Sequence, residues 1–256
     1  MLCGRTDSAG PVPSKGVRSP AEHAYRGLAA VGPATDTLLN AVDKLDEAAV
    51  RAPSRLLGWS RAHLITHLAR NADGLVNLLT WARTGIEHPM YVSRADRDAA
   101  IEKGSVRGYP LLVEDLNAAC QRFTSAAEAM PEEAWSTTVT GSKGRPMTAA
   151  SVPWLRVREV WVHLVDLDVG TGFDAVPDDI VEDLLEDAVA QYQGRNDVPA
   201  LILQARLPDG HERSWPLGRA DGPAVRGDGR NLLAWLTGRG DGSGLAGALP
   251  QLPPWA

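Results

Sequence analysis

The stretch VREVWVHLVDLDVG, residues 157–170, decides how the first two thirds of the chain fold. Its apolar residues recur at helical spacing, and Gly170 stands where a helix would end. Glu159 and His163 are four residues apart, so a helix places both side chains on one face. Such a pair is either a surface contact contributing about 0.2–0.5 kcal/mol or part of a site inside the protein.

Helical spacing of apolar residues recurs in four long segments of the chain, at residues 21–49, 60–85, 109–130 and 150–170. Gly32 and Pro33 favour a break in the first segment. The second begins at a good N-cap, Ser60, and ends at Gly85. Four helices joined by shorter connections predict a four-helix bundle over residues 21–170, a fold that builds metal sites from facing side chains.

The chain differs in character on either side of this predicted bundle. Residues 1–20 are rich in Gly, Pro and Ser and predict a flexible tail. Residues 171–256 contain an acidic amphipathic helix, two strands around a Pro-Asp-Gly turn, a third short strand and a last helix. They predict a small α+β domain with an antiparallel sheet. The proline-rich last segment, ALPQLPPWA, is expected to pack on its surface through Trp255. The fold class is therefore mainly α, with a smaller α+β domain.

The composition excludes several kinds of partner. The 256 residues carry a formal net charge of −6, which indicates neither nucleic-acid binding nor attraction to an anionic membrane. No signal-like or membrane-length apolar run occurs, so we expect a cytoplasmic, monomeric protein. Cys3 and Cys120 form no C-x-x-C motif, which argues against a disulfide framework or a thiolate metal site. An anionic ligand would need local cations to hold it.

A second helix supplies a third candidate ligand. His67 lies between Leu64 and Leu68 on the apolar stripe of the segment 60–85. If the bundle brings this stripe against Glu159 and His163, the three side chains complete an open metal site. Three protein ligands leave a position for water or substrate, as in catalytic zinc sites. Nitrogen and oxygen donors without thiolate suit manganese, iron, cobalt or nickel as well.

Two neighbouring residues leave alternatives open. His63 also stands four residues from His67, which is ligand spacing, but it lies in the first turn of its helix. Asp166, one turn beyond His163, either orients the imidazole through its second nitrogen or faces solvent near the helix end.

Three stretches carry a family resemblance: GWSRAHLITHLARNADGLVNLLTWARTG, HPMYVSRADRDAAIEKGS and REVWVHLVDLDVG. They closely resemble the mycothiol-dependent maleylpyruvate isomerases, which belong to the DinB-like metal-dependent superfamily. The resemblance covers nearly the whole chain after residue 21, including the terminal PPWA and the C-terminal domain, which is sterol-carrier-protein-like in the family.

The resemblance implies a set of site residues. The family's metal ligands fall on His67, Glu159 and His163, which decides against His63. A functional arginine of the family falls on Arg97, with Arg94 as a close alternative.

The resemblance also implies a reaction: conversion of maleylpyruvate to fumarylpyruvate in gentisate breakdown. A thiolate adds to the cis alkene of this small dicarboxylate, the resulting single bond rotates, and elimination restores a trans alkene. Mycothiol or another low-molecular-weight thiol supplies the sulfur, because neither protein cysteine is suitably placed. A divalent metal, zinc by preference, lowers the pKa of the thiol, and Arg97 holds a substrate carboxylate. Asn71 and Asp73 are candidates for thiol binding or for supporting the ligands.

Two other functions use the same residues. A thiol S-transferase acting on a different electrophile would share every metal ligand and differ only in its substrate pocket. A binding module with no enzymatic activity would hold the metal for structural purposes and close its fourth position.

Overall fold

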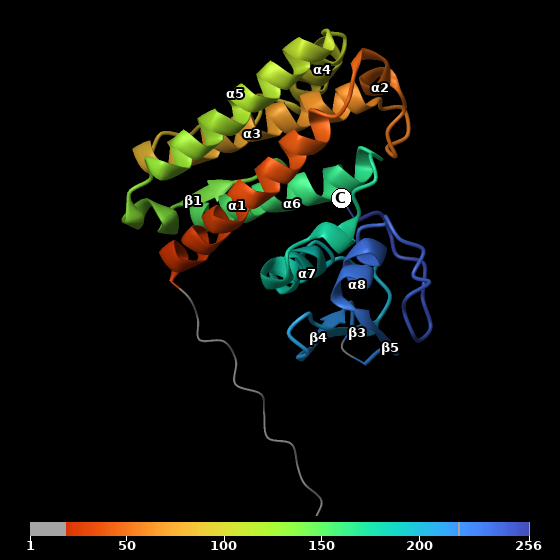
Figure 1. The fold of residues 1–256 in the computed structure, drawn as a ribbon. Coiled ribbons are helices and arrows are strands. Elements are labelled where there is room, and N and C mark those ends of the chain that lie inside the picture. The colour runs from red at the N-terminus through yellow and green to blue at the C-terminus, as the bar shows by residue number, and fades with distance from the viewer. Residues whose placement is uncertain (1–18, 220, 256) are drawn as a thin grey trace, which may run out of the picture.

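The computed structural model describes residues 19–219 and 221–255. A bundle of long helices is followed by a smaller part built on a three-stranded sheet (Figure 1), which confirms the mainly α fold class. The helices of the first part are α1 (Pro20–Val42), α2 (Glu47–Arg51), α3 (Arg61–Thr84), α4 (Arg94–Ser105), α5 (Tyr109–Glu128) and α6 (Val152–Asp166). Within the described residues, no helix combines the length and hydrophobicity that a membrane span requires.

Helix α3 begins and ends where the sequence predicts. Ser60 is its N-cap, and Gly85 closes it with a left-handed backbone at φ 71°. The leucines of its predicted apolar stripe are all buried: Leu64, Leu68, Leu75, Leu78 and Leu79. This stripe packs against α5 and α6, so the face that carries His67 is directed into the bundle.

Helix α1 differs from the prediction at two points. It is continuous, with Pro33 inside it, so the expected break at Gly32 and Pro33 is wrong. Neighbouring small residues bury themselves against α6, and this packing offsets the hydrogen bond that proline cannot donate. The helix also starts at Pro20, inside the predicted tail, because Ser19 and Glu22 form a capping box. The rest of that tail, residues 1–18, lies outside the described residues.

A short hairpin leads into α6. Strands β1 (Thr138–Thr140) and β2 (Pro146–Thr148) pair antiparallel, and 3₁₀ turns flank them at Glu132–Ser136 and Ala149–Ser151. The hairpin packs against α3 on the side of the bundle where α6 begins.

The C-terminal part contains 3₁₀ turns at Phe173–Ala175 and Asp178–Ile180, helices α7 (Val181–Ala190) and α8 (Gly229–Leu236), and strands β3 (Leu201–Arg206), β4 (Glu212–Leu217) and β5 (Ala224–Asp228). The sheet order is β4-β3-β5. Strands β3 and β4 are antiparallel, but β5 runs parallel to β3, so the expected fully antiparallel sheet is wrong. The loop from β4 crosses the beginning of β3, which makes β3 and β5 start at the same end. Gly222 permits this crossing, since a Cβ there would lie 2.0 Å from the carbonyl oxygen of Ala200.

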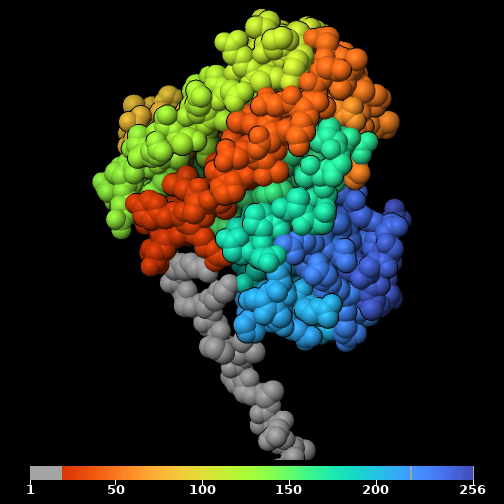
Figure 2. Space-filling view, in the orientation of Figure 1, coloured from red at the N-terminus to blue at the C-terminus, as the bar shows by residue number. Residues whose placement is uncertain are grey.

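Ion pairs join the C-terminal part to the bundle. They link α1 and α6 to α7 and to the residues beyond α8: Arg26 with Asp183, Arg158 with Asp187, and Asp166 with Arg239. In the space-filling view, α7 lies between α1 and the C-terminal residues (Figure 2).

The end of the described chain packs as the sequence predicts. Trp255 is buried, and its Nε1 donates to the carbonyl oxygen of Ala188 in α7 at 3.2 Å. The terminal segment is therefore held against the C-terminal part.

Candidate metal centre

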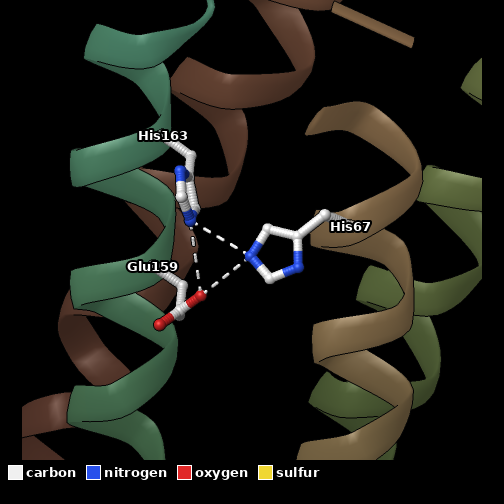
Figure 3. Close-up of side chains that lie close together, drawn as sticks. All are labelled: His67, Glu159 and His163. Atoms are coloured by element: carbon white, nitrogen blue, oxygen red, sulfur yellow. Dashed lines mark hydrogen bonds and ion pairs between the residues drawn. The ribbon is translucent and has the colours of Figure 1, made fainter. Parts of the chain in front are cut away.

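Helices α3 and α6 bring His67, Glu159 and His163 together (Figure 3). His67 Nε2 lies 3.1 Å from Glu159 Oε2 and 3.1 Å from His163 Nε2. His163 Nε2 lies 3.6 Å from Glu159 Oε2. Of the two interpretations of the Glu159–His163 pair, the structure supports a site inside the protein, because both side chains point toward His67 and away from solvent.

This cluster fits a divalent metal ion. Ligand atoms about 2.0–2.1 Å from a tetrahedral zinc are about 3.3 Å apart, close to the three separations observed here. Two imidazole nitrogens and one carboxylate oxygen suit zinc and several other first-row metals. Since the cluster offers three ligand atoms, a fourth position would be left for a small molecule.

His63 belongs to a different set of contacts. Its Nδ1 lies 2.7 Å from the hydroxyl of the N-cap residue Ser60, and its Nε2 lies 3.2 Å from the hydroxyl of Ser105. These contacts tie the start of α3 to α4. His63 therefore helps cap its helix, while His67 alone of this pair faces α6.

Asp166 meets the imidazole of His163, as one of the two sequence interpretations requires. Its Oδ2 lies 2.8 Å from His163 Nδ1, and its side chain is only 1% exposed. Arg239 donates two hydrogen bonds to the same carboxylate, at 3.0 and 2.7 Å. A carboxylate behind a ligating histidine holds the ring orientation and raises its basicity.

Glu159 has its own support on α6 and α7. Its Oε1 lies 3.4 Å from a guanidinium nitrogen of Arg158, and Arg158 also pairs with Asp187 at 3.1 Å. The same guanidinium lies 5.7 Å from the ring centre of Trp255. The C-terminal part thus contacts a residue beside each of the two α6 members of the cluster.

The protonation states of the cluster follow from burial and mutual hydrogen bonding. Burial lowers the pKa of His67 to about 4, so this ring is neutral at pH 7. Burial opposes ionisation of Glu159, but hydrogen bonds from His163 and His67 hold its pKa well below 4.5. Burial also opposes charge on His163, yet hydrogen bonds to Asp166 and Glu159 raise its pKa. His67 is therefore neutral and Glu159 ionised, the charge states in which they bind a metal, while the raised pKa of His163 favours a proton with which a metal must compete.

Arg97 reaches the cluster from α4. Its Nη2 lies 3.1 Å from His67 Nδ1, on the ring edge opposite Glu159. Its guanidinium carbon lies 6.0 Å from the ring centre of Trp59 and 5.9 Å from that of Tyr91. Arg94 has a side chain that is 93% exposed and pairs only weakly with Asp98 at 3.9 Å. The structure therefore brings Arg97 to the cluster and leaves Arg94 outside it.

Asn71 and Asp73, the candidates for thiol binding or for supporting the ligands, lie in different surroundings. Asn71 is buried, and its Oδ1 accepts a hydrogen bond from the buried Arg156 at 3.1 Å. Asp73 instead pairs with Arg70 and Arg122 toward the protein surface. Asn71 alone remains a candidate for supporting the site.

Several cationic side chains lie near Glu159. Partial burial, together with the charges of Arg158, Arg145 and Arg195, lowers the pKa of Lys143 in the β1–β2 turn. Glu159 lies close enough to oppose this shift. Cations therefore gather beside Glu159 in a chain whose net charge is −6.

A helix bundle with a buried cluster of two histidines and one glutamate on facing helices is typical of metal-binding helix-bundle proteins. The family model described as the Mycothiol maleylpyruvate isomerase N-terminal domain matches residues 31–168. The chain belongs to this family.

Solved structures agree with that assignment. The crystal structure of a mycothiol-dependent maleylpyruvate isomerase resembles this chain with a TM-score of 0.82 and 30% sequence identity, covering 91% of this chain and 97% of that one. The structure of a histidine-to-alanine mutant of a mycothiol-dependent maleylpyruvate isomerase matches with the same values. No curated protein sequence matches the chain.

Proposed function

We propose that the protein is a thiol-dependent cis-trans isomerase that converts maleylpyruvate to fumarylpyruvate, with mycothiol as the thiol and a divalent metal in its site. The observation that carries this proposal is the compact cluster of His67, Glu159 and His163. It lies in a fold that matches a mycothiol-dependent maleylpyruvate isomerase over 91% of this chain.

His67, Glu159 and His163 would hold the metal, and Asp166 would orient His163 from behind. A divalent cation in this site lowers the pKa of a coordinated thiol, which otherwise lies near 8.5, so that the reactive thiolate exists at neutral pH. Zinc is the metal we expect from the donor set.

Arg97 would bind a substrate carboxylate. In the structure, His67 Nδ1 lies 3.1 Å from Arg97, which can only donate, so Nδ1 must accept. A neutral histidine that ligates a metal through Nε2 carries its proton on Nδ1 and cannot accept there. Nη1 of Arg97 already donates to Asp98 at 2.7 Å, but Nη2 then needs another acceptor, and a carboxylate offers the strongest one.

The cations beside Glu159 suit a doubly charged substrate. Lys143 and Arg158 lie on the hairpin and on α6, and their local field would attract a dicarboxylate against the negative charge of the whole chain.

Other functions are less well supported. The solved structures matched here are isomerases, which does not favour a thiol S-transferase acting on another electrophile. The monomeric state, the cytoplasmic location and the lack of a nucleic-acid partner stay predictions of the sequence.

The test is an assay of maleylpyruvate by its ultraviolet absorbance, with metal-replete protein and with mycothiol, glutathione or no thiol. We expect turnover to fumarylpyruvate with mycothiol and none without a thiol. Full activity in the metal-stripped protein would contradict the metal-assisted mechanism. No turnover with any thiol would instead favour the S-transferase.

A further inference from the structure

The loop between α3 and α4 is docked tightly on α3. A Cβ added to Gly74 would lie 2.9 Å from both the carbonyl oxygen and the Cγ of Met90, so glycine is what allows this approach. Asn77 reinforces the docking by donating from Nδ2 to the carbonyl oxygens of Pro89 (3.3 Å) and Met90 (3.4 Å). The position of the next residue, Tyr91, is therefore fixed relative to α3.

Tyr91 lies over the face of α3 that leads to the metal cluster. His67, Asn71 and Gly74 share this face at helical spacing, and Cε1 of Tyr91 lies 3.1 Å from the Cβ position of Gly74. The Tyr91 ring also flanks the guanidinium of Arg97, at 5.9 Å. The side chain thus lies beside Arg97, whose Nη2 reaches His67 at 3.1 Å.

The hydroxyl of Tyr91 has donors as its neighbours. Hydrogen bonding from Arg97 and Asn71 acts to lower the pKa of the phenol, which places both side chains near its oxygen. Asn71 Oδ1 already accepts from Arg156, so the Asn71 amide contributes an N–H, and Arg97 can only donate. Both neighbours lower the pKa of the phenol, as donors to its oxygen do, so the phenol proton points to a bound molecule.

The phenol also stays protonated at neutral pH. Burial and the negative charge of Glu159 raise the pKa of Tyr91 above 10, and hydrogen bonds from Arg97 and Asn71 only partly oppose this. The group is therefore a hydrogen-bond donor under ordinary conditions.

We propose that Tyr91 is a further catalytic residue, whose hydroxyl donates a hydrogen bond to the ketone oxygen conjugated with the alkene of the substrate. This inference rests on the proposed function. In maleylpyruvate the alkene lies between a carboxylate and a ketone, so the charge released by addition to the alkene is carried by that ketone oxygen.

The step balances without any further reagent. The alkene carbon next to the carboxylate gains a C–S bond, the alkene electron pair forms a double bond to the ketone carbon, and the carbonyl pair moves to oxygen as an enolate. Tyr91 stabilises this oxygen while keeping its own proton, as oxyanion-hole donors do. After rotation about the former alkene bond, the electron flow reverses, the C–S bond breaks and the ketone re-forms.

Tyr91→Phe tests the proposal, because it removes the hydroxyl and keeps the ring against Gly74 and Arg97. We expect kcat for maleylpyruvate to fall by about 10²–10³-fold, as for other oxyanion donors, with bound metal and the KM for mycothiol unchanged. Tyr109→Phe is the matched control, since the Tyr109 hydroxyl donates to the carbonyl of Val42 at 3.1 Å, outside the site. Its kcat should equal that of the unaltered protein.

A binding measurement gives a readout that does not depend on turnover. Acetylpyruvate shares the dioxo-acid part of maleylpyruvate but has no alkene, and its affinity can be measured by calorimetry without thiol. We expect Tyr91→Phe to weaken it about 3- to 10-fold, the effect of one hydrogen bond.

The outcomes distinguish the two proposals. Turnover by the unaltered protein with an equal kcat in Tyr91→Phe overturns the role of Tyr91 and leaves the isomerase intact. The catalytic role of Tyr91 is also overturned, in favour of a structural one, by a second result. In that result Tyr91→Phe loses bound metal or helical circular dichroism, while its folded fraction binds acetylpyruvate as the unaltered protein does. No turnover by the unaltered protein overturns the isomerase and the role of Tyr91 with it.

Discussion

Asp166 accepts a hydrogen bond at 2.8 Å from His163 Nδ1, while Arg239 holds the same carboxylate from the C-terminal part of the chain. His163 Nε2 therefore faces His67 and Glu159 with its ring orientation set from behind. The C-terminal part acts on the cluster through this contact although it contributes none of the three ligand atoms.

Asp166→Asn should weaken metal binding about 10- to 100-fold, because an amide orients the imidazole less well and does not raise its basicity. Competition with a chromogenic chelator measures the zinc affinity. Asp73→Asn is the control, since Asp73 pairs with Arg70 and Arg122 toward the protein surface and not with a candidate ligand. Equal zinc affinity in the Asp166 variant and the unaltered protein would show that the contact is only structural.

His67→Ala, Glu159→Gln and His163→Ala should each lose stoichiometric metal and isomerase activity while the helical circular dichroism is kept. Each change removes one of the three clustered ligand atoms. His63→Ala should retain one metal per chain, because His63 contacts Ser60 and Ser105 instead. Atomic absorption after gel filtration reads the metal content. Metal loss in His63→Ala, with retention in His67→Ala, would reverse the assignment.

Arg97→Leu should raise the KM for maleylpyruvate about 10- to 100-fold, since charge-assisted hydrogen bonds contribute about 1.5–3 kcal/mol. Arg94→Leu should leave KM unchanged, because the Arg94 side chain is 93% exposed. Steady-state kinetics at saturating mycothiol compares the two variants. Equal effects would mean that the charge of α4, and not the position of Arg97, matters.

Local patterns in the sequence predicted candidate ligands on regular helices, while the choice of His67 over His63 and the choice of Arg97 came from the family resemblance. Helical spacing placed Glu159 and His163 on one face of α6 and His67 on the buried stripe of α3, and the structure brings these faces together. The caps at Ser60 and Gly85 are equally local signals, which is why the bounds of α3 are confirmed.

The residues that sequence reasoning missed depend on tertiary contacts. Arg239 lies 73 positions beyond Asp166, and no spacing rule connects them. Trp59 and Tyr91 flank Arg97 only because loops dock beside α3. The parallel pairing of β5 and the continuity of α1 through Pro33 likewise follow from packing that overrides local preference.

Metal affinity should fall as the pH is lowered. Without metal, the hydrogen bonds to Asp166 and Glu159 raise the pKa of His163 above 6.5, so below that raised pKa a metal must displace a proton. The apparent affinity should drop by up to about tenfold per pH unit there and level off above it. His67, with a pKa of about 4, contributes to this pH dependence only when the pH approaches that value. Calorimetry in buffers of different ionisation enthalpy counts the released proton. A metal affinity that does not change between pH 5 and 8 would contradict this linkage.

Gly74→Ala should impair the enzyme without emptying its metal site. The added Cβ would lie 2.9 Å from the carbonyl oxygen of Met90, so the loop that carries Tyr91 must shift. Overpacking costs about 1–3 kcal/mol, which exceeds the gain of up to about 1 kcal/mol from replacing a helical glycine. Gly32→Ala provides the control, since nothing lies within 4 Å of its Cβ position in α1 and only the helical gain remains. Thermal unfolding and kcat should therefore separate the two variants: a lower melting temperature and lower kcat for Gly74→Ala, against a higher melting temperature and unchanged kcat for Gly32→Ala. Normal kcat in Gly74→Ala would mean that the site tolerates displacement of Tyr91.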